Sequence, residues 1–256
     1  MVMLVDVHAH LDYPVILGDI DVVLQRAASA GVKAIVANGI DSASNRVVID
    51  LAARYPMIRP ALGIYPPDAL KVEHEQEKLP FSPIDISAEL DFIRSHDPVA
   101  IGEIGMDLSY GKDEAAQAYL FRKLIQIAKD KDIPVIVHSR KAEPQVIDVL
   151  EESKHKKVVL HCFNGRKHLI KRAADLGYSF SIPTNIVRSE HFQTLVGMVH
   201  ISQLLTETDT PYLSPFRDKS NEPAFVIESV KKIAEVKGMT VEDTANNIFM
   251  NYQRMF

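Results

Sequence analysis

One stretch near the N-terminus decides the fold: Leu4-Val5-Asp6-Val7-His8-Ala9-His10-Leu11-Asp12. Apolar and polar residues alternate along it, which is the two-residue period of a β-strand. Since side chains two positions apart on a strand point to the same face, His8 and His10 point together, with Asp6 beside them. Two neutral imidazoles can bind one metal ion, because each offers a nitrogen lone pair. The alternative is a pair of hydrogen-bonded core histidines, and the stretch by itself favours neither interpretation.

Length and composition fit one large domain or two small ones, and because the sequence shows no domain linker, we expect a single domain covering residues 1–256. The chain is 46% hydrophobic and 25% charged, which supplies enough apolar mass for a sizeable core. Its formal charge is -5 and its pI is about 6.1, so no global basic field attracts DNA, RNA or anionic lipid. Nucleic acid would therefore have to bind through a local patch or through metal ions.

The N-terminal sequence and cysteine content predict a cytoplasmic location. Cys162 is the single cysteine, so no intrachain disulfide can form, as is usual in a reducing compartment. The N-terminus lacks the basic region and long apolar core of a secretion signal. No apolar run reaches membrane-spanning length. We expect no membrane association, and nothing in the sequence indicates an obligate protein partner.

Eight apolar, β-branched runs predict strands, each followed by a helical pattern. They are Leu4–Leu11, Val32–Gly39, Ile58–Ile64, Val99–Gly105, Pro134–His138, Val158–Cys162, Tyr178–Ile182 and Leu204–Thr208. Several are almost continuously apolar, as in parallel sheets covered on both faces. Eight such units in this length predict an α/β protein, a (β/α)8 TIM barrel. The alternative is a doubly wound open sheet, but the Gly-x-Gly-x-x-Gly fingerprint that would favour it does not follow the first strand.

One segment, Asp68–Asp85, departs from this regular alternation. It carries the acidic run Glu73-His-Glu-Gln-Glu-Lys78, and prolines stand at positions 67, 80 and 83. We expect a solvated, irregular excursion between the third strand and its helix.

Four further polar residues stand at the ends of other predicted strands. They are Glu103, His138, His161 and Asp209. In a (β/α)8 barrel the carboxyl ends of all strands open onto one face, so these side chains would converge with His8 and His10. A single histidine after an apolar strand is more often a hydrogen-bonded core or loop residue. Six such residues at the same end of their strands are typical of a metal site.

The number of candidate ligands predicts two divalent ions. A tetrahedral catalytic site needs three protein ligands plus water, so six side chains exceed what one ion uses. Two ions sharing a carboxylate use all six, and such pairs suit hydrolysis at phosphorus or at a carbonyl. Imidazoles favour Zn²⁺ or Mn²⁺, as well as Fe²⁺ or Co²⁺, and an oxygen-rich half-site could accept Mg²⁺.

Six stretches together give the sequence a specific resemblance. They are Asp6-Val-His-Ala-His-Leu11, Gly102-Glu-Ile-Gly-Met-Asp107, Pro134-Val-Ile-Val-His-Ser-Arg140, His161-Cys-Phe-Asn-Gly165, Glu207-Thr-Asp-Thr-Pro-Tyr-Leu213 and Asn221-Glu-Pro223. On these stretches the chain resembles the TatD family of metal-dependent deoxyribonucleases, within the amidohydrolase-type barrels, over essentially its whole length. The combination is specific, whereas His-x-His alone is a weak motif.

This resemblance implies a role for each candidate ligand. His8, His10 and Asp209 would hold the first metal, His138 and His161 the second, and Glu103 would bridge them. The implied enzyme is a phosphodiesterase or deoxyribonuclease that acts on DNA ends or short nucleic acids. Asp209, a carboxylate at the first metal, is the best candidate for the general base that accepts a proton from a metal-activated water.

Four other residues are candidates for contacting the substrate. Arg140 and Arg217 follow the fifth and eighth strands and could bind phosphate oxygens, although Arg140 could equally be a surface or salt-bridged arginine. Tyr65 could stack on a base or donate a hydrogen bond, or simply pack a loop. Glu207 shares the face of Asp209 and could contact the substrate or support the ligands from behind.

The sequence departs from the family pattern near these positions. Tyr65 stands where the family often has histidine in Gly-x-His-Pro, and Phe216 and Asp218 stand where it often has Pro-His-Arg-Gly. These changes leave the ligand set intact but leave the substrate open. The alternatives are a metal-dependent amide, ester or lactone hydrolase acting on a small molecule, and a barrel that binds without catalysis. The intact ligand positions count against the last.

Overall fold

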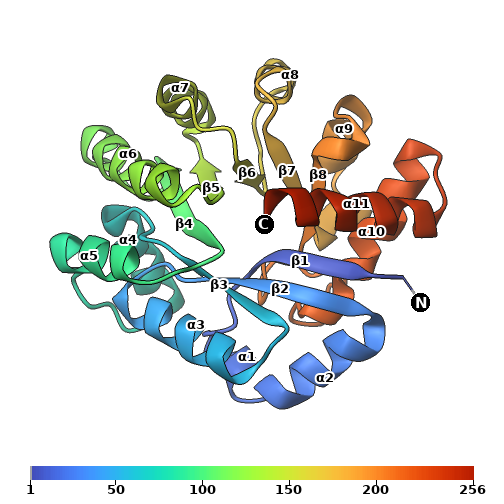
Figure 1. The fold of residues 1–256 in the computed structure, drawn as a ribbon, viewed down its shortest axis with the longest axis horizontal. Helices are drawn as coiled ribbons and strands as arrows, with labels where there is room; N and C mark the ends of the chain where they lie inside the picture. The colour runs from blue at the N-terminus through green and yellow to red at the C-terminus, as the bar shows by residue number, and fades with distance from the viewer. Residues whose placement is uncertain (1) are drawn as a thin grey trace.

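Eight parallel strands surrounded by helices form a (β/α)8 barrel in the computed structural model, which describes residues 2–256 (Figure 1). The strands are β1 (Leu4–Ala9), β2 (Val32–Asn38), β3 (Ile58–Leu62), β4 (Ala100–Asp107), β5 (Val135–Arg140), β6 (Val158–His161), β7 (Ser179–Pro183) and β8 (Leu204–Glu207). They neighbour one another in sequence order. The predicted fold class is confirmed.

Helices cover the outside of the barrel. They are α1 (Pro14–Leu17), α2 (Ile20–Ala30), α3 (Ser42–Arg54), α4 (Pro67–Glu77), α5 (Ile86–Ser95), α6 (Glu114–Lys131), α7 (Glu143–Ser153), α8 (Lys167–Asp175), α9 (Glu190–Met198), α10 (Val226–Lys237) and α11 (Val241–Met255), with 3-10 turns η1 (Thr184–Val187), η2 (Ile201–Gln203) and η3 (Pro223–Phe225). Asn251 of α11 donates to the carbonyl of Leu204, which fixes α11 at the start of β8. Among the helices of residues 2–256, none has the length and apolar character needed to cross a membrane.

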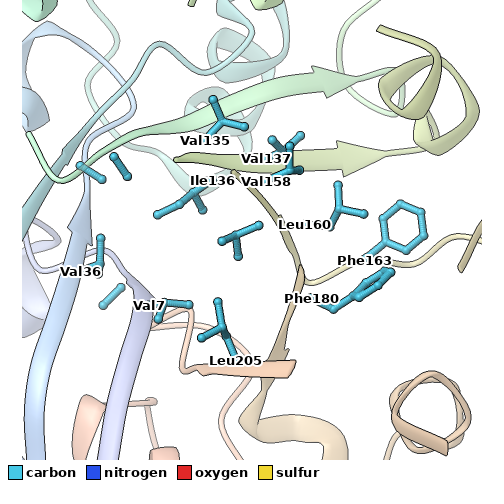
Figure 2. Close-up of a cluster of buried hydrophobic side chains, with 14 of the residues drawn as sticks. Val7, Val36, Val135, Ile136, Val137, Val158, Leu160, Phe163, Phe180 and Leu205 are labelled. Atoms are coloured by element: carbon cyan, nitrogen blue, oxygen red, sulfur yellow. The ribbon is translucent and has the colours of Figure 1, made fainter. Parts of the chain in front are cut away.

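Strand side chains make the core on both faces of the sheet (Figure 2). Val135, Ile136 and Val137 are all fully buried, although successive residues of a strand point to opposite faces. One face fills the inside of the barrel and the other packs under the helices, which explains the continuous apolar runs. Phe163 and Phe180 add an edge-to-face pair, with ring centroids 5.8 Å apart.

The first and last strands close the barrel through backbone hydrogen bonds at their carboxyl ends. The amide of Asp209 donates to the carbonyl of His8 over 2.9 Å, and the amide of His10 donates to the carbonyl of Thr210 over 3.0 Å. The seam between the two ends of the chain therefore runs through three of the predicted ligands.

The expectation of an irregular excursion over Asp68–Asp85 is wrong for its first half, where α4 forms. Pro67 stands in the first turn, where its fixed φ suits a helix. The Asp68 carboxylate accepts from the backbone amide of Lys112 over 2.8 Å, and His74 is buried against Phe81. Only residues 78–85 lack helix or strand. The acidic run thus belongs to a packed helix beside the carboxyl ends of the strands.

Candidate metal centre

Four side chains from three strand ends bring donor atoms close together. The Nε2 atoms of His8, on β1, and His10, directly after β1, lie 3.2 Å apart. Each lies 3.4 Å from Oε2 of Glu103 on β4 and 3.5 Å from Oδ1 of Asp209, which follows β8. Ligands of a tetrahedral Zn²⁺ with bonds of 2.0–2.1 Å lie about 3.3 Å from one another. Among these residues, His8, His10 and Asp209 bring possible ligand atoms within 4.8 Å of one another, close enough to hold a single divalent ion.

His138 faces the other oxygen of Glu103, and His161 lies beside His8. Oε1 of Glu103 lies 2.8 Å from Nδ1 of His138 on β5. His161, at the end of β6, stacks on His8 with ring centroids 3.7 Å apart. His8, Glu103 and His161 each bring a possible ligand atom within 4.8 Å of the others. The two oxygens of Glu103 thus face different histidines, as a carboxylate shared by two ions requires.

Glu207 supports His161 from below the site. Its Oε2 lies 2.9 Å from Nδ1 of His161, and its Oε1 accepts from the backbone amide of Cys162 over 2.9 Å. The Ser181 hydroxyl also donates to this carboxylate. Because Nδ1 of His161 is engaged, Nε2 is left for the site. The structure corrects the expectation that Glu207 contacts substrate, because its side chain is fully buried and both oxygens are used within the protein.

Asp107, which the sequence analysis did not single out, holds His138 from the other side. Its Oδ2 lies 3.3 Å from Nε2 of His138, and its Oδ1 accepts from the backbone amides of Ser109 and Tyr110. Of the three roles proposed for Tyr65, the structure shows that of a hydrogen-bond donor. Its hydroxyl donates to Oδ2 of Asp107 over 2.7 Å, so the partner is a protein side chain. Carboxylates that orient a ligating histidine in this way are usual in metal sites. The only sequence signal was the position of Asp107 at the end of β4.

The four histidines divide into two pairs by pKa. Burial lowers the pKa of His8 and of His161, so both rings are neutral and offer lone pairs. Burial also acts to lower the pKa of His10 and His138, but hydrogen bonds to carboxylates overcome it. They raise the pKa of His10 well above its usual value and that of His138 to about 9. The neighbouring carboxylates thus favour protonated rings at His10 and His138. A metal ion would compete with these protons for the ring nitrogens.

The carboxylates divide in the same way. Burial acts to raise the pKa of Glu103 and Asp209, but the surrounding histidines lower both below their usual values. Burial raises the pKa of Asp6 and of Glu207 to about 8. The two carboxylates that face the centre are therefore ionised, whereas burial disfavours the charged form of the two behind it.

A cavity of about 610 Å³ opens onto the centre and is lined in part by His138, His161 and Asp209. Arg140 lines this cavity and a smaller one of about 40 Å³ that reaches His10 and Glu103. The structure thus brings Arg140 to the site.

Arg217 is not brought to the site. It is exposed in the loop after β8 and lines neither cavity. Arg188 holds that loop by donating to the carbonyls of Ser214 and Pro215. The expectation that Arg217 contacts a substrate phosphate is therefore not met in this arrangement.

Comparisons with known proteins agree with this fold. The family model described as TatD related DNase matches residues 5–256. The chain is 35% identical to Deoxyribonuclease TATDN3 of Homo sapiens, covering 99% of this chain and 94% of that protein. It is 31% identical to the uncharacterized metal-dependent hydrolase YabD of Bacillus subtilis, covering 99% of both. The crystal structure of YJJV, a TatD homolog from Escherichia coli, superposes with a TM-score of 0.86 at 28% identity, covering 99% of this chain and 97% of that one.

Proposed function

Since the chain belongs to the TatD-related DNase family of metal-dependent hydrolases, we propose that it is a two-metal phosphodiesterase that hydrolyses DNA ends or short nucleic acids. One observation carries the two-metal part of this proposal. Glu103 turns one oxygen toward His8 and His10 and the other toward His138. The printed name of the human relative, Deoxyribonuclease TATDN3, supports DNA as the substrate class.

Zn²⁺, Mn²⁺ or Mg²⁺ bound at both positions would lower the pKa of water and stabilise charge developing on the phosphoryl group. Asp209 has a lowered pKa and is therefore an ionised base, which accepts a proton from the attacking water and later passes it to the leaving oxygen. The Arg140 guanidinium binds a phosphate oxygen at the cavity wall. Asp107 and Glu207 keep His138 and His161 oriented while charge moves.

The size and charge of the molecule support a short substrate. The cavity of about 610 Å³ has the volume of a site for a small ligand or for one strand end. The chain carries a formal charge of -5, so it lacks the broad basic field that holds long duplexes on a protein surface. Binding must then depend on Arg140 and Lys141, which line the cavity, and on cations held in the centre.

Metal analysis followed by a nuclease assay tests the proposal. We expect the purified protein to hold two divalent ions per chain, and chelation to abolish release of nucleotides from short DNA. Asp209→Asn should lower kcat by orders of magnitude, because the variant loses both a ligand and the base. Asp218→Asn, an exposed carboxylate nearby in the loop after β8, serves as the matched control. Unchanged turnover in Asp209→Asn would contradict the role given to that residue.

A second candidate is a metal-dependent hydrolase of amides, esters or lactones in small molecules. The acidic side chains Glu73 of α4 and Glu143 of α7 favour it, because both line the cavity and carboxylates there repel a polyanion. A panel of uncharged esters and lactones beside phosphodiesters separates the two. Turnover of the uncharged compounds alone would establish this candidate and reject the first.

A further inference from the structure

Helix α4 places a carboxylate against the arginine of the site. Oε1 of Glu73 lies 3.3 Å from Nη1 of Arg140. The same Nη1 lies 3.4 Å from Oδ2 of Asp107. Asp107 is fully buried, whereas the Glu73 side chain is 20% exposed and lines the cavity. Arg140 is therefore held from below by one carboxylate and covered on the cavity side by another.

The position of Glu73 is fixed by contacts at both ends of its helix. Asp68, in the first turn, accepts from the backbone amides of Lys112 and Asp113. Glu77, in the last turn, accepts from the Tyr212 hydroxyl over 2.6 Å. Burial raises the pKa of the Glu73 carboxyl, and the charge of Arg140 opposes that shift. The pair is thus partly withdrawn from water, where charge interactions are stronger than at an open surface.

We propose that Glu73 is a specificity-determining residue that selects against doubly charged phosphate groups at Arg140. An anion that binds the guanidinium takes the place of Glu73, while Asp107 keeps Arg140 in position from below. The displaced carboxylate stays on a tethered helix within a few ångströms of the bound anion. Repulsion between them grows with the charge of the anion.

The phosphate charge separates two substrate classes. A phosphodiester carries one negative charge, whereas a terminal phosphomonoester carries about 1.5 to 2 negative charges at pH 7. Glu73 therefore disfavours monoesters and inorganic phosphate more than it disfavours diesters. This inference rests on the proposed function for its biological meaning, but the charge selection itself can be measured without turnover.

Binding of two small anions to the metal-loaded protein tests the inference. The probes are inorganic phosphate, which is largely doubly charged at pH 7.5, and dimethyl phosphate, which is singly charged. Calorimetry gives Kd for each in the wild type, in Glu73→Gln, and in Glu75→Gln, an exposed carboxylate on the same helix. We expect Glu73→Gln to bind phosphate about tenfold and dimethyl phosphate about threefold more tightly. Glu75→Gln should change neither.

Three results would overturn the inference: an unchanged Kd in Glu73→Gln, weaker binding, or an equal gain for both anions. A further variant tests the mechanism of selection. In an Arg140→Gln background the same Glu73→Gln change should alter neither Kd, because the guanidinium for which carboxylate and anion compete is gone. Circular dichroism checks that each variant folds. If the selection is found but DNA is not cleaved, only the proposed function fails.

Discussion

Replacing Glu207 by glutamine tests whether the buried layer behind the ligands sets metal affinity. One oxygen of Glu207 contacts Nδ1 of His161, and the other accepts from the Cys162 amide. When the ring proton is on Nδ1, both contacts need an acceptor, and glutamine offers one oxygen and one NH₂ group, so one donor loses its acceptor. If the NH₂ group faces His161, the ring proton must move to Nε2, the nitrogen that faces the centre. The lone pair available to a cation is then lost.

The expected effect is large on metal affinity and modest on folding. Loss of a supporting hydrogen bond to a ligating histidine typically lowers metal affinity about 10- to 100-fold, or about 1.4–2.7 kcal/mol. The fold should lose only about 1–3 kcal/mol, because one buried donor is left unsatisfied and the shape is kept. The variant should therefore fold and bind one of its two ions more weakly.

Calorimetric titration with Mn²⁺ or Zn²⁺ measures the affinities, and urea unfolding measures the stability. Glu89→Gln is the matched control, since Glu89 is also buried but pairs with Arg46 and Asn45, away from the centre. It should lose stability while keeping both metal affinities. Wild-type affinity at both positions in Glu207→Gln would refute the argument that this carboxylate fixes the ring of His161.

Three further predictions address other parts of the site. Tyr65→Phe removes the hydroxyl that holds the carboxylate behind His138, and kcat should fall about tenfold; full activity would reject this positioning role. The pKa of His138 is about 9, and the ring must lose its proton before it binds a cation. Metal affinity should therefore rise as pH increases from 7 to 9 and then level off. A flat pH profile in calorimetry would contradict this. Gly63→Ala puts a Cβ 2.3 Å from the backbone oxygen of Glu103 and should cost about 3 kcal/mol in urea unfolding; Gly197→Ala, whose Cβ meets nothing closer than 3.9 Å, should cost much less.

The barrel could be predicted from the sequence because each strand is buried on both faces and stands out as an apolar run. The bounds are less certain, since hydrogen bonds rather than composition end a strand. The seventh strand was predicted as Tyr178–Ile182 and is Ser179–Pro183. The convergence of six polar side chains could also be predicted, because strand parity and the shared carboxyl face of the barrel dictate it.

The positions of helix α4 and of the loop that carries Arg217 could not be predicted, because residues far away in the sequence hold them in place. Helix α4 has a weak apolar pattern, and it is fixed by partners such as Lys112 and Tyr212, far along the chain. Its acidic composition resembles that of a loop, so the contact of Glu73 with Arg140 left no local signal. Arg217 shows the opposite error, because its position after β8 indicated a site residue while the carbonyl contacts of Arg188 hold the loop elsewhere.

The meeting of β1 and β8 at the metal centre links the chemistry of the molecule to its durability. His8 and His10 come from the beginning of the chain and Asp209 from near its end, more than 190 residues later. An ion coordinated by all three would connect the first and last strands of the barrel. It would stabilise the native state in proportion to the logarithm of its concentration. When the concentration of that ion in a cell is low, the cell would lose the protein through unfolding and proteolysis, as well as losing the reaction.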